Sequence, residues 1–202
     1  MSRSTIDLFV EDRAHEEFLK AMISRLSAEE RRETVIRVRS ARGGRGRVLE
    51  EFELYQEAVR RGLSSIPDIL VVAVDANCAS FHETLKSLAS RLKEGFEGRA
   101  VYACPDPHVE RWYMADPESF AEVVGAEPPR ERRKCERDRY KRHLVEAIRK
   151  GGHTPTLGGV EFAIELAQKM DLYRAGKNEP SLKAFVESLR RMLRLLSDVM
   201  QP

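Results

Sequence analysis

Short apolar runs alternate with longer segments of helical periodicity through the first half of the chain. The apolar runs predict strands at 6–10, 34–38, 69–74 and 100–104. Segments in which apolar residues recur every three or four positions predict helices at 13–26, 48–62 and 81–96. Strands that alternate with such helices are typical of βαβ units. We therefore predict an α/β fold: a Rossmann-like sheet of about four mostly parallel strands flanked by helices.

The last third of the chain has a different pattern. No strand is expected after Pro129, and the periodicity predicts helices at 131–150, 160–170 and 181–196, after a short helical piece at 109–114. The glycine-rich segment 41–46 is expected to be a flexible loop. We predict an α/β domain over residues 1–128 and a helical extension packed on it over residues 129–202.

Composition narrows the class of protein. The chain has 202 residues, of which 42% are hydrophobic and 34% charged, which suits one α/β domain with a charged surface. No apolar stretch reaches the roughly 18–20 residues that a membrane-spanning helix needs, so no membrane association is expected. The first residues lead directly into a predicted strand, so no signal peptide is expected either.

The cysteines point to a reducing compartment. Their number is odd and their spacing wide, with Cys78, Cys104 and Cys135 far apart in the sequence. This pattern indicates neither a zinc knuckle nor a disulfide framework. We therefore expect buried thiols at Cys78 and Cys104 and a cytoplasmic location.

Polar side chains follow two of the apolar runs at the point where each predicted strand ends. Glu11 and Asp12 follow the first run, and Asp75 and Asn77 follow the third. Neighbouring parallel strands lie roughly 4.8 Å apart, and two carboxylates that close repel unless a proton or a cation lies between them. Hard oxygen ligands favour Mg²⁺ or Mn²⁺ over zinc. The alternative is that these residues cap the helices that follow them.

Positive charge is concentrated in two segments although the net charge is only +2. Residues 34–49 hold five arginines and no acid, and residues 130–150 hold ten Lys or Arg against four acids. The remainder is then acidic by about nine charges. A basic surface beside an acidic pocket suits an enzyme that acts on phosphodiesters, whereas the alternative is arginine-rich helices on ordinary solvated faces.

Four segments resemble the Toprim domain of topoisomerases, primases and OLD-type nucleases. Residues 8–12 and 72–77 are similar to its glutamate after the first strand and its Asp-x-Asp after the third. Residues 105–116 and 178–185 resemble segments of small, stand-alone bacterial Toprim-like proteins. The resemblance implies an Mg²⁺-dependent (or Mn²⁺-dependent) nuclease or phosphotransfer enzyme that acts on nucleic acid, with a role in bacterial defence or nucleic-acid processing.

Carried over residue by residue, the resemblance implies a metal site. Glu11 would be the general acid/base or a shared metal ligand, and Asp75 the principal ligand. Asn77 stands where the family has its second aspartate, and Glu110 would close the site. Asp12 replaces the usual glycine, which disfavours a positive φ there. Asp12 and Asn77, the two departures from the family pattern, favour an alternative: a non-catalytic module that binds nucleotide, nucleic acid or a protein partner.

Other residues carry weaker signals. The arginines expected to guide a nucleic acid are Arg39, Arg42, Arg45 and Arg47. His15 lies one helical turn after Glu11, and we expect a solvated helix histidine, with a proton shuttle at the rim as the alternative. His108 and His153 follow loop signals, but no spacing identifies either as a ligand. Trp112 is expected to anchor the short helix to the core, with stacking on a base as the alternative. A protein partner or a homodimer stays open.

Overall fold

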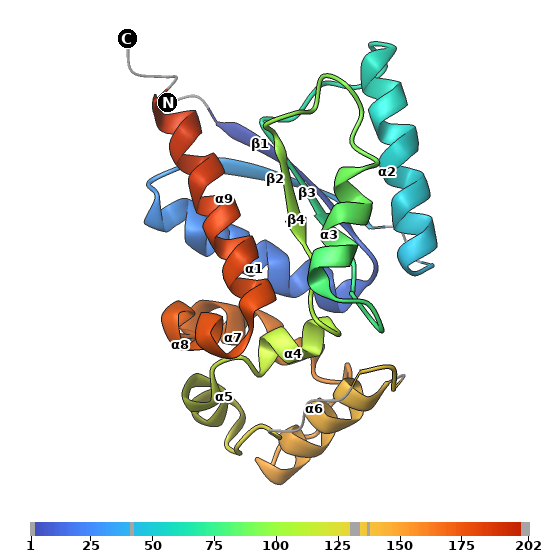
Figure 1. Ribbon diagram of the computed structural model, residues 1–202. Helices are drawn as coiled ribbons and strands as arrows, with labels where there is room; N and C mark the ends of the chain where they lie inside the picture. The colour runs from blue at the N-terminus through green and yellow to red at the C-terminus, as the bar shows by residue number, and fades with distance from the viewer. Residues whose placement is uncertain (1–2, 41–42, 130–133, 137, 199–202) are drawn as a thin grey trace.

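A four-stranded, all-parallel sheet organises the structure, in agreement with the predicted α/β class (Figure 1). The computed structural model describes residues 3–40, 43–129, 134–136 and 138–198. The strands lie in the order β2-β1-β3-β4. Their bounds are β1 Ser4–Val10, β2 Thr34–Ser40, β3 Ile69–Ala73 and β4 Ala100–Ala103.

The strand order creates a switch point between β1 and β3. The chain leaves β1 in one direction to form β2, then crosses back over β1 to form β3 and β4 on its other side. Val10 pairs with Ala73 at the carboxyl end of these two strands, so Glu11 and the residues after Ala73 leave the sheet side by side. Open α/β sheets bind their ligands at such a switch point.

Helices cover both faces of the sheet (Figure 1). Helices α2 (Arg45–Arg60) and α3 (Phe81–Ala89) lie on one face, where Phe52 and Leu88 join a cluster with Phe9 and Val72. Helix α1 (Arg13–Glu29) and the C-terminal helices lie on the other. The alternation of side chains along β1 and β3 divides the apolar residues between the two clusters, and the fully buried strand β3 contributes to both.

The C-terminal part of the described chain is helical and shares a hydrophobic cluster with the sheet. Ile6 and Val71 of the sheet belong to the same buried cluster as Leu166 and Leu189 of the C-terminal helices. The helices after β4 are α4 Val109–Tyr113, α5 Pro117–Val124, α6 Arg139–Lys150, the 3₁₀ turn η1 Val160–Phe162, α7 Ala163–Lys169, α8 Leu172–Asn178 and α9 Pro180–Asp198. None of the described helices is both long and apolar enough to cross a bilayer.

Two helix boundaries differ from the sequence prediction for identifiable reasons. Helix α2 begins at Arg45, inside the segment predicted to be a loop, because Gly44 makes the turn at a φ of 79° and the apolar stripe of α2 begins at Val48. The predicted loop residues 41 and 42 lie outside the described residues. Helix α3 ends at Ala89, seven residues earlier than predicted. The buried side chain of Gln56 binds Arg91 O at 3.1 Å and Lys93 N at 2.7 Å, which fixes a loop there.

Helices α5 and α8 were absent from the sequence prediction, and α6 begins at Arg139 rather than at 131. Residues 130–133 and 137 lie outside the described residues. Asp138 is the N-cap residue of α6 and has a left-handed φ of 58°, which is not a helical conformation. Helix α5 begins with Pro117 in its first turn, where proline is favourable. In the sequence prediction, the same proline ends the short helix before it.

Trp112 and Asp116 fix helix α4 and its flank to the C-terminal helices. Trp112 is fully buried, stacks on Phe185 at 5.6 Å and donates its Nε1 hydrogen to Ser181 at 2.9 Å, so its predicted role as an anchor is confirmed. Asp116 is also buried. Its carboxylate accepts hydrogen bonds from Arg174 Nε at 2.9 Å and from the Ser119 hydroxyl at 2.6 Å.

Asp116 gives a testable contribution to stability. Burial raises the pKa of its carboxyl, but Arg174 and Ser119 outweigh it and lower the pKa below the ordinary 3.8. The stabilisation is therefore present above pH 3.8 and is lost as the pH falls through the native pKa. We predict that Asp116→Asn lowers the free energy of unfolding by about 1–3 kcal/mol at neutral pH, measured by urea denaturation.

The pH dependence provides the check. The difference in free energy of unfolding between wild type and Asp116→Asn should become smaller as the pH falls below 3.8. Glu118→Gln is the matched control, because Glu118 pairs with the same arginine at 3.1 Å but has an exposed side chain, and it should change stability by less than about 0.5 kcal/mol. A difference for Asp116→Asn that stays constant with pH would contradict the assignment.

Candidate active site

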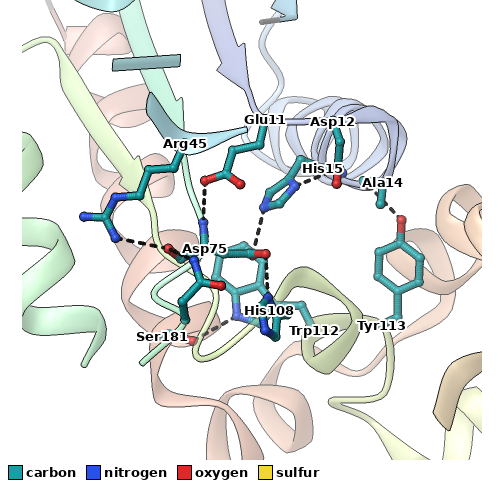
Figure 2. A network of polar contacts seen from close by, with 11 residues as sticks. Glu11, Asp12, Ala14, His15, Arg45, Asp75, His108, Trp112, Tyr113 and Ser181 are labelled. Atoms are coloured by element: carbon teal, nitrogen blue, oxygen red, sulfur yellow. Dashed lines mark hydrogen bonds and ion pairs between the residues drawn. The ribbon is translucent and has the colours of Figure 1, made fainter. Parts of the chain in front are cut away.

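The carboxylate of Asp75 lies at the centre of a polar network at the switch point (Figure 2). Asp75 follows β3, and its two oxygens contact different histidines. His15 Nε2 lies 3.0 Å from Oδ1, and His108 Nδ1 lies 2.8 Å from Oδ2. Segments that are 60 and 33 residues away in the sequence therefore meet on one acidic side chain.

The first turn of α1 positions His15. Asp12 is the N-cap residue of α1 and accepts the backbone hydrogen of His15 at 3.0 Å. The same oxygen of Asp12 lies 2.9 Å from Nδ1 of the His15 ring. The capping role that was the alternative for Asp12 is thus confirmed. The φ of Asp12 is −155°, so the backbone does not need the positive φ that a glycine would allow.

Two backbone hydrogen bonds tie the loop after β3 to the loop after β4. Ala76 N donates to Pro105 O at 2.8 Å, and Asn77 N donates to Pro107 O at 2.9 Å. Asn77 has a left-handed φ of 55°, a conformation that asparagine adopts more readily than most residues. These bonds place His108, the N-cap residue of α4, beside Asp75. Neither Asp75 nor Asn77 caps α3, because Ser80 does so with Glu83 in a capping box.

Glu11 and Arg45 approach Asp75 from the other side (Figure 2). Glu11 Oε1 accepts the backbone hydrogen of Asp75 at 3.2 Å, and Arg45 Nη1 lies 3.5 Å from Asp75 O. Burial raises the pKa of Glu11 to about 7, against the opposing charge of His15. A carboxyl group whose pKa lies near neutrality can both accept and donate a proton at physiological pH.

Glu110 is the fourth acidic residue of the network. It lies on α4 and is 5% exposed. Burial and then the charge of Asp75 raise its pKa above the ordinary value, so the two groups lie within electrostatic reach of each other. Of the four predicted ligands, Glu11 accepts the backbone hydrogen of Asp75, and Glu110 lies within electrostatic reach of Asp75. Asn77 is exposed, and its amide nitrogen lies 3.4 Å from Asp75 O.

Charge alternates through the network. Burial opposes protonation of His15, but the carboxylates of Asp75 and Asp12 raise its pKa well above the ordinary value. Asp75 raises the pKa of His108 in the same way, against burial. The two imidazoles in turn lower the pKa of the Asp75 carboxyl despite its burial. These pKa shifts favour the protonated form of each histidine, and in that form each ring donates a charge-assisted hydrogen bond to the Asp75 carboxylate.

The predicted nucleic-acid-binding arginines have different environments. Arg39 pairs with the buried Asp7 and lies over the ring of Tyr55 at 4.3 Å, and Arg47 pairs with Glu50 and Glu51 on its own helix. Arg42 lies outside the described residues. Among the three that are described, Arg45 is the one with a hydrogen bond into the network.

The sequence interpretation of His15 as a solvated helix histidine is wrong, since the side chain is fully buried. Its spacing is the signal that could have identified it. A side chain three residues after an N-cap residue can fold back onto that residue, and here the N-cap residue, Asp12, follows the end of β1. His108 was recognised as well placed but was not assigned to the site. It precedes α4 directly, which is the position from which it reaches Asp75.

The cysteines differ from the expectation at one position. Cys104 is a buried free thiol, as predicted, and burial raises its pKa to about 12. Cys78 is not a buried thiol, because it is exposed and forms a disulfide with Cys135. The two Cα atoms lie 4.8 Å apart, across 57 residues of sequence. The loop that follows Asp75 and Asn77 is therefore linked covalently to the segment before α6.

A metal site is not preformed in the described part of the chain, where no three His, Cys, Asp or Glu side chains stand in a metal-binding arrangement. Both oxygens of Asp75 contact imidazole nitrogens. A cation on Asp75 would therefore share its carboxylate with the histidines or replace one of them.

The network predicts a large stability effect at His15. We expect His15→Ala to lower the free energy of unfolding by about 3–5 kcal/mol, because it leaves the buried Asp75 carboxylate with one partner fewer. Equilibrium unfolding in urea measures this change. His82→Ala on α3 is the matched control, since His82 is exposed and should change stability by less than about 0.5 kcal/mol. Equal effects of the two substitutions would show that the network does not stabilise the fold.

The disulfide predicts a dependence of stability on reductant. Closing a loop of this length stabilises a fold by about 2–4 kcal/mol. We expect Cys78→Ser to lose a stabilisation of that size without reductant and to match wild type in excess reductant. Thermal unfolding under both conditions measures it. A wild-type transition that reductant does not move would contradict the bond.

Comparison with known families completes the description of this site. No curated protein and no solved structure matches the sequence. Residues 10–190 match a family described as Domain of unknown function (DUF4276). That range begins one residue before Glu11 and contains every residue of the network around Asp75. The chain therefore belongs to the DUF4276 family.

Proposed function

We propose that this protein is a Toprim-like, Mg²⁺-dependent nuclease or phosphotransfer enzyme that acts on nucleic acid. The observation that carries the proposal is the Asp75 carboxylate at the β1/β3 switch point, held by His15 and His108, with Glu11 bound to its backbone hydrogen and Glu110 within electrostatic reach. Three carboxyl groups and two histidines at the ligand-binding edge of a parallel sheet are costly to gather, and such clusters are enriched at functional sites.

The chemistry of the donor set fits a hard divalent cation. Glu110 is buried and Glu11 is half-buried. Burial raises the pKa of both carboxyl groups, and the charge of Asp75 raises each pKa further. A cation relieves the burial and repulsion that favour the protonated forms. Glu11, Asp75 and Glu110 would hold Mg²⁺ or Mn²⁺, with Asn77 as a neutral oxygen ligand. Bound there, the cation would supply positive charge to the oxygens of a phosphodiester transition state.

The other residues of the network have roles that follow from their contacts. Glu11, with a pKa of about 7, is suited to take or give the proton of the attacking group. His15 and His108 orient the Asp75 carboxylate from two directions. Arg45 adds positive charge at the same rim, where a phosphate would lie. Arg39 and Arg47 would contribute to nucleic-acid binding through the potential of the surface rather than through the site itself.

A cytoplasmic location and a role in bacterial defence or nucleic-acid processing belong to this proposal as well. The absence of a described helix able to span a bilayer agrees with a protein outside the membrane. The Cys78–Cys135 disulfide is unusual for a reducing compartment.

The occupied carboxylate of Asp75 favours a second candidate function. Because both of its oxygens contact histidines, the site is satisfied without a metal. A non-catalytic module that binds nucleotide, nucleic acid or a protein partner, or one that forms a homodimer, would need this hydrogen-bonded network but no metal. Calorimetric titration with Mg²⁺ and Mn²⁺ separates the two functions, since a module of this kind would show no binding at millimolar metal.

The catalytic proposal predicts metal-dependent cleavage. We expect the protein to cleave DNA or RNA in the presence of Mg²⁺ or Mn²⁺, and Glu11→Gln and Asp75→Asn to lower the rate by about 10²–10⁴-fold. Gel electrophoresis of labelled oligonucleotides measures the rate. Glu94→Gln is the matched control, because Glu94 is exposed in the loop before β4 and should leave the rate unchanged. Equal cleavage by wild type and both site variants would refute the proposal.

A further inference from the structure

A cavity of about 430 Å³ adjoins the network and has no role in the function proposed above. It lies between the start of α1, helix α4, helix α6 and the segment around Leu157. Its size falls within the roughly 300–1,000 Å³ typical of small-molecule sites. Asp12 and Glu110 line it and also belong to the surroundings of Asp75, so the cavity and the network share a wall.

The interior of the cavity is mainly apolar. Leu144 and Val145 of α6, Val160 of η1, and Leu157 in the loop before it form much of its wall. Leu157 is 46% exposed although it is a large apolar side chain. Such an exposed leucine beside a concave apolar surface is what a ligand would cover on binding.

Positive charge accompanies the apolar wall. Lys141 and Arg142 line the cavity from α6, and Arg13 lines it from the start of α1. The charge of Lys141 acts on both Asp12 and Glu110, which places it near the wall that the cavity shares with the network. A ligand that fits this cavity therefore combines a compact apolar or aromatic body with a negative group next to it.

We propose that this cavity binds a nucleobase of the substrate, with its phosphate between Lys141 and the network around Asp75. The inference rests on the proposed function, because the phosphodiester chemistry at Asp75 selects a nucleotide among ligands that join an apolar body to an anion. A base has the flat apolar faces that aliphatic and aromatic walls cover. The side chain of Asp12 lines the cavity and is 45% exposed, so its carboxylate can accept a hydrogen bond from an amino group of a base edge.

Calorimetric titration with adenosine 5′-monophosphate and cytidine 5′-monophosphate tests the proposal. Both are phosphomonoesters without a phosphodiester bond to cleave, so the titration can include Mg²⁺. We expect each to bind the wild type at least about tenfold more tightly than ribose 5-phosphate, which lacks the base. Dodecyl phosphate, an apolar chain on the same anion, should bind more weakly than either nucleotide.

Variants locate the binding. Leu157→Glu places a charge on the apolar wall and should weaken nucleotide binding by about tenfold or more. Lys141→Ala should weaken the binding of both nucleotides and ribose 5-phosphate. Leu63→Glu and Lys150→Ala are matched controls, since both residues are exposed and neither lines the cavity. Unchanged thermal unfolding of each variant shows that it is folded.

Three results would overturn the proposal: ribose 5-phosphate binding as tightly as the nucleotides, dodecyl phosphate binding more tightly than they do, or Leu157→Glu leaving nucleotide affinity within twofold of wild type. The cleavage assay is separate from these measurements. If nucleotides bind in the cavity while Glu11→Gln and Asp75→Asn do not affect cleavage, the cavity stands as a nucleotide site and the catalytic proposal fails.

Discussion

The Asp75 carboxylate between the His15 and His108 imidazoles is the interaction on which the candidate site depends. Each of the three groups would be costly to bury as an isolated charge. The Asp75 carboxylate gives each imidazole a partner of opposite charge, Asp12 adds a second carboxylate beside His15, and these contacts join α1, the loop after β3 and the start of α4. The switch point of the sheet thus has a fixed polar centre, around which Glu11, Arg45 and Glu110 are arranged.

This arrangement relates the stability of the protein to its proposed chemistry. A carboxylate held by imidazoles from two different segments is preorganised, which is what a metal ligand requires. The same contacts compete with a cation for the oxygens of Asp75. The cavity lined by Asp12 and Glu110 extends this centre toward α6, where apolar walls and Lys141 lie together. The disulfide between Cys78 and Cys135 links the same two regions covalently.

The sequence predicts the sheet well because the apolar runs of β1 and β3 are continuous and buried on both faces. It also predicts which residues follow the strand ends, and so it places Glu11 and Asp75 side by side. Local patterns do not show where a helix ends when contacts with a distant residue fix its end. For α3, that residue is Gln56, which holds the loop after the helix. They also miss α5 and α8, because short helices have too few turns to show a periodicity.

The parts of the site that the sequence did not predict depend on contacts between distant segments. The pKa of the buried His15 ring rises largely because Asp75, 60 residues away in the sequence, contacts its Nε2 atom. Cys78 and Cys135 meet across 57 residues of sequence, a pairing that their spacing does not reveal. Arg45 reaches the network because α2 begins three residues earlier than its apolar stripe.

The most direct test of this account is the titration of the histidine rings by ¹⁵N nuclear magnetic resonance, without added metal. We predict that His15 stays protonated to a pH well above its ordinary pKa of 6.5, and that Asp75→Asn lowers the pKa of both His15 and His108. If His15 titrated near 6.5 in the wild type and Asp75→Asn left both rings unchanged, the carboxylate would not hold the two histidines, and the account of this site would be wrong.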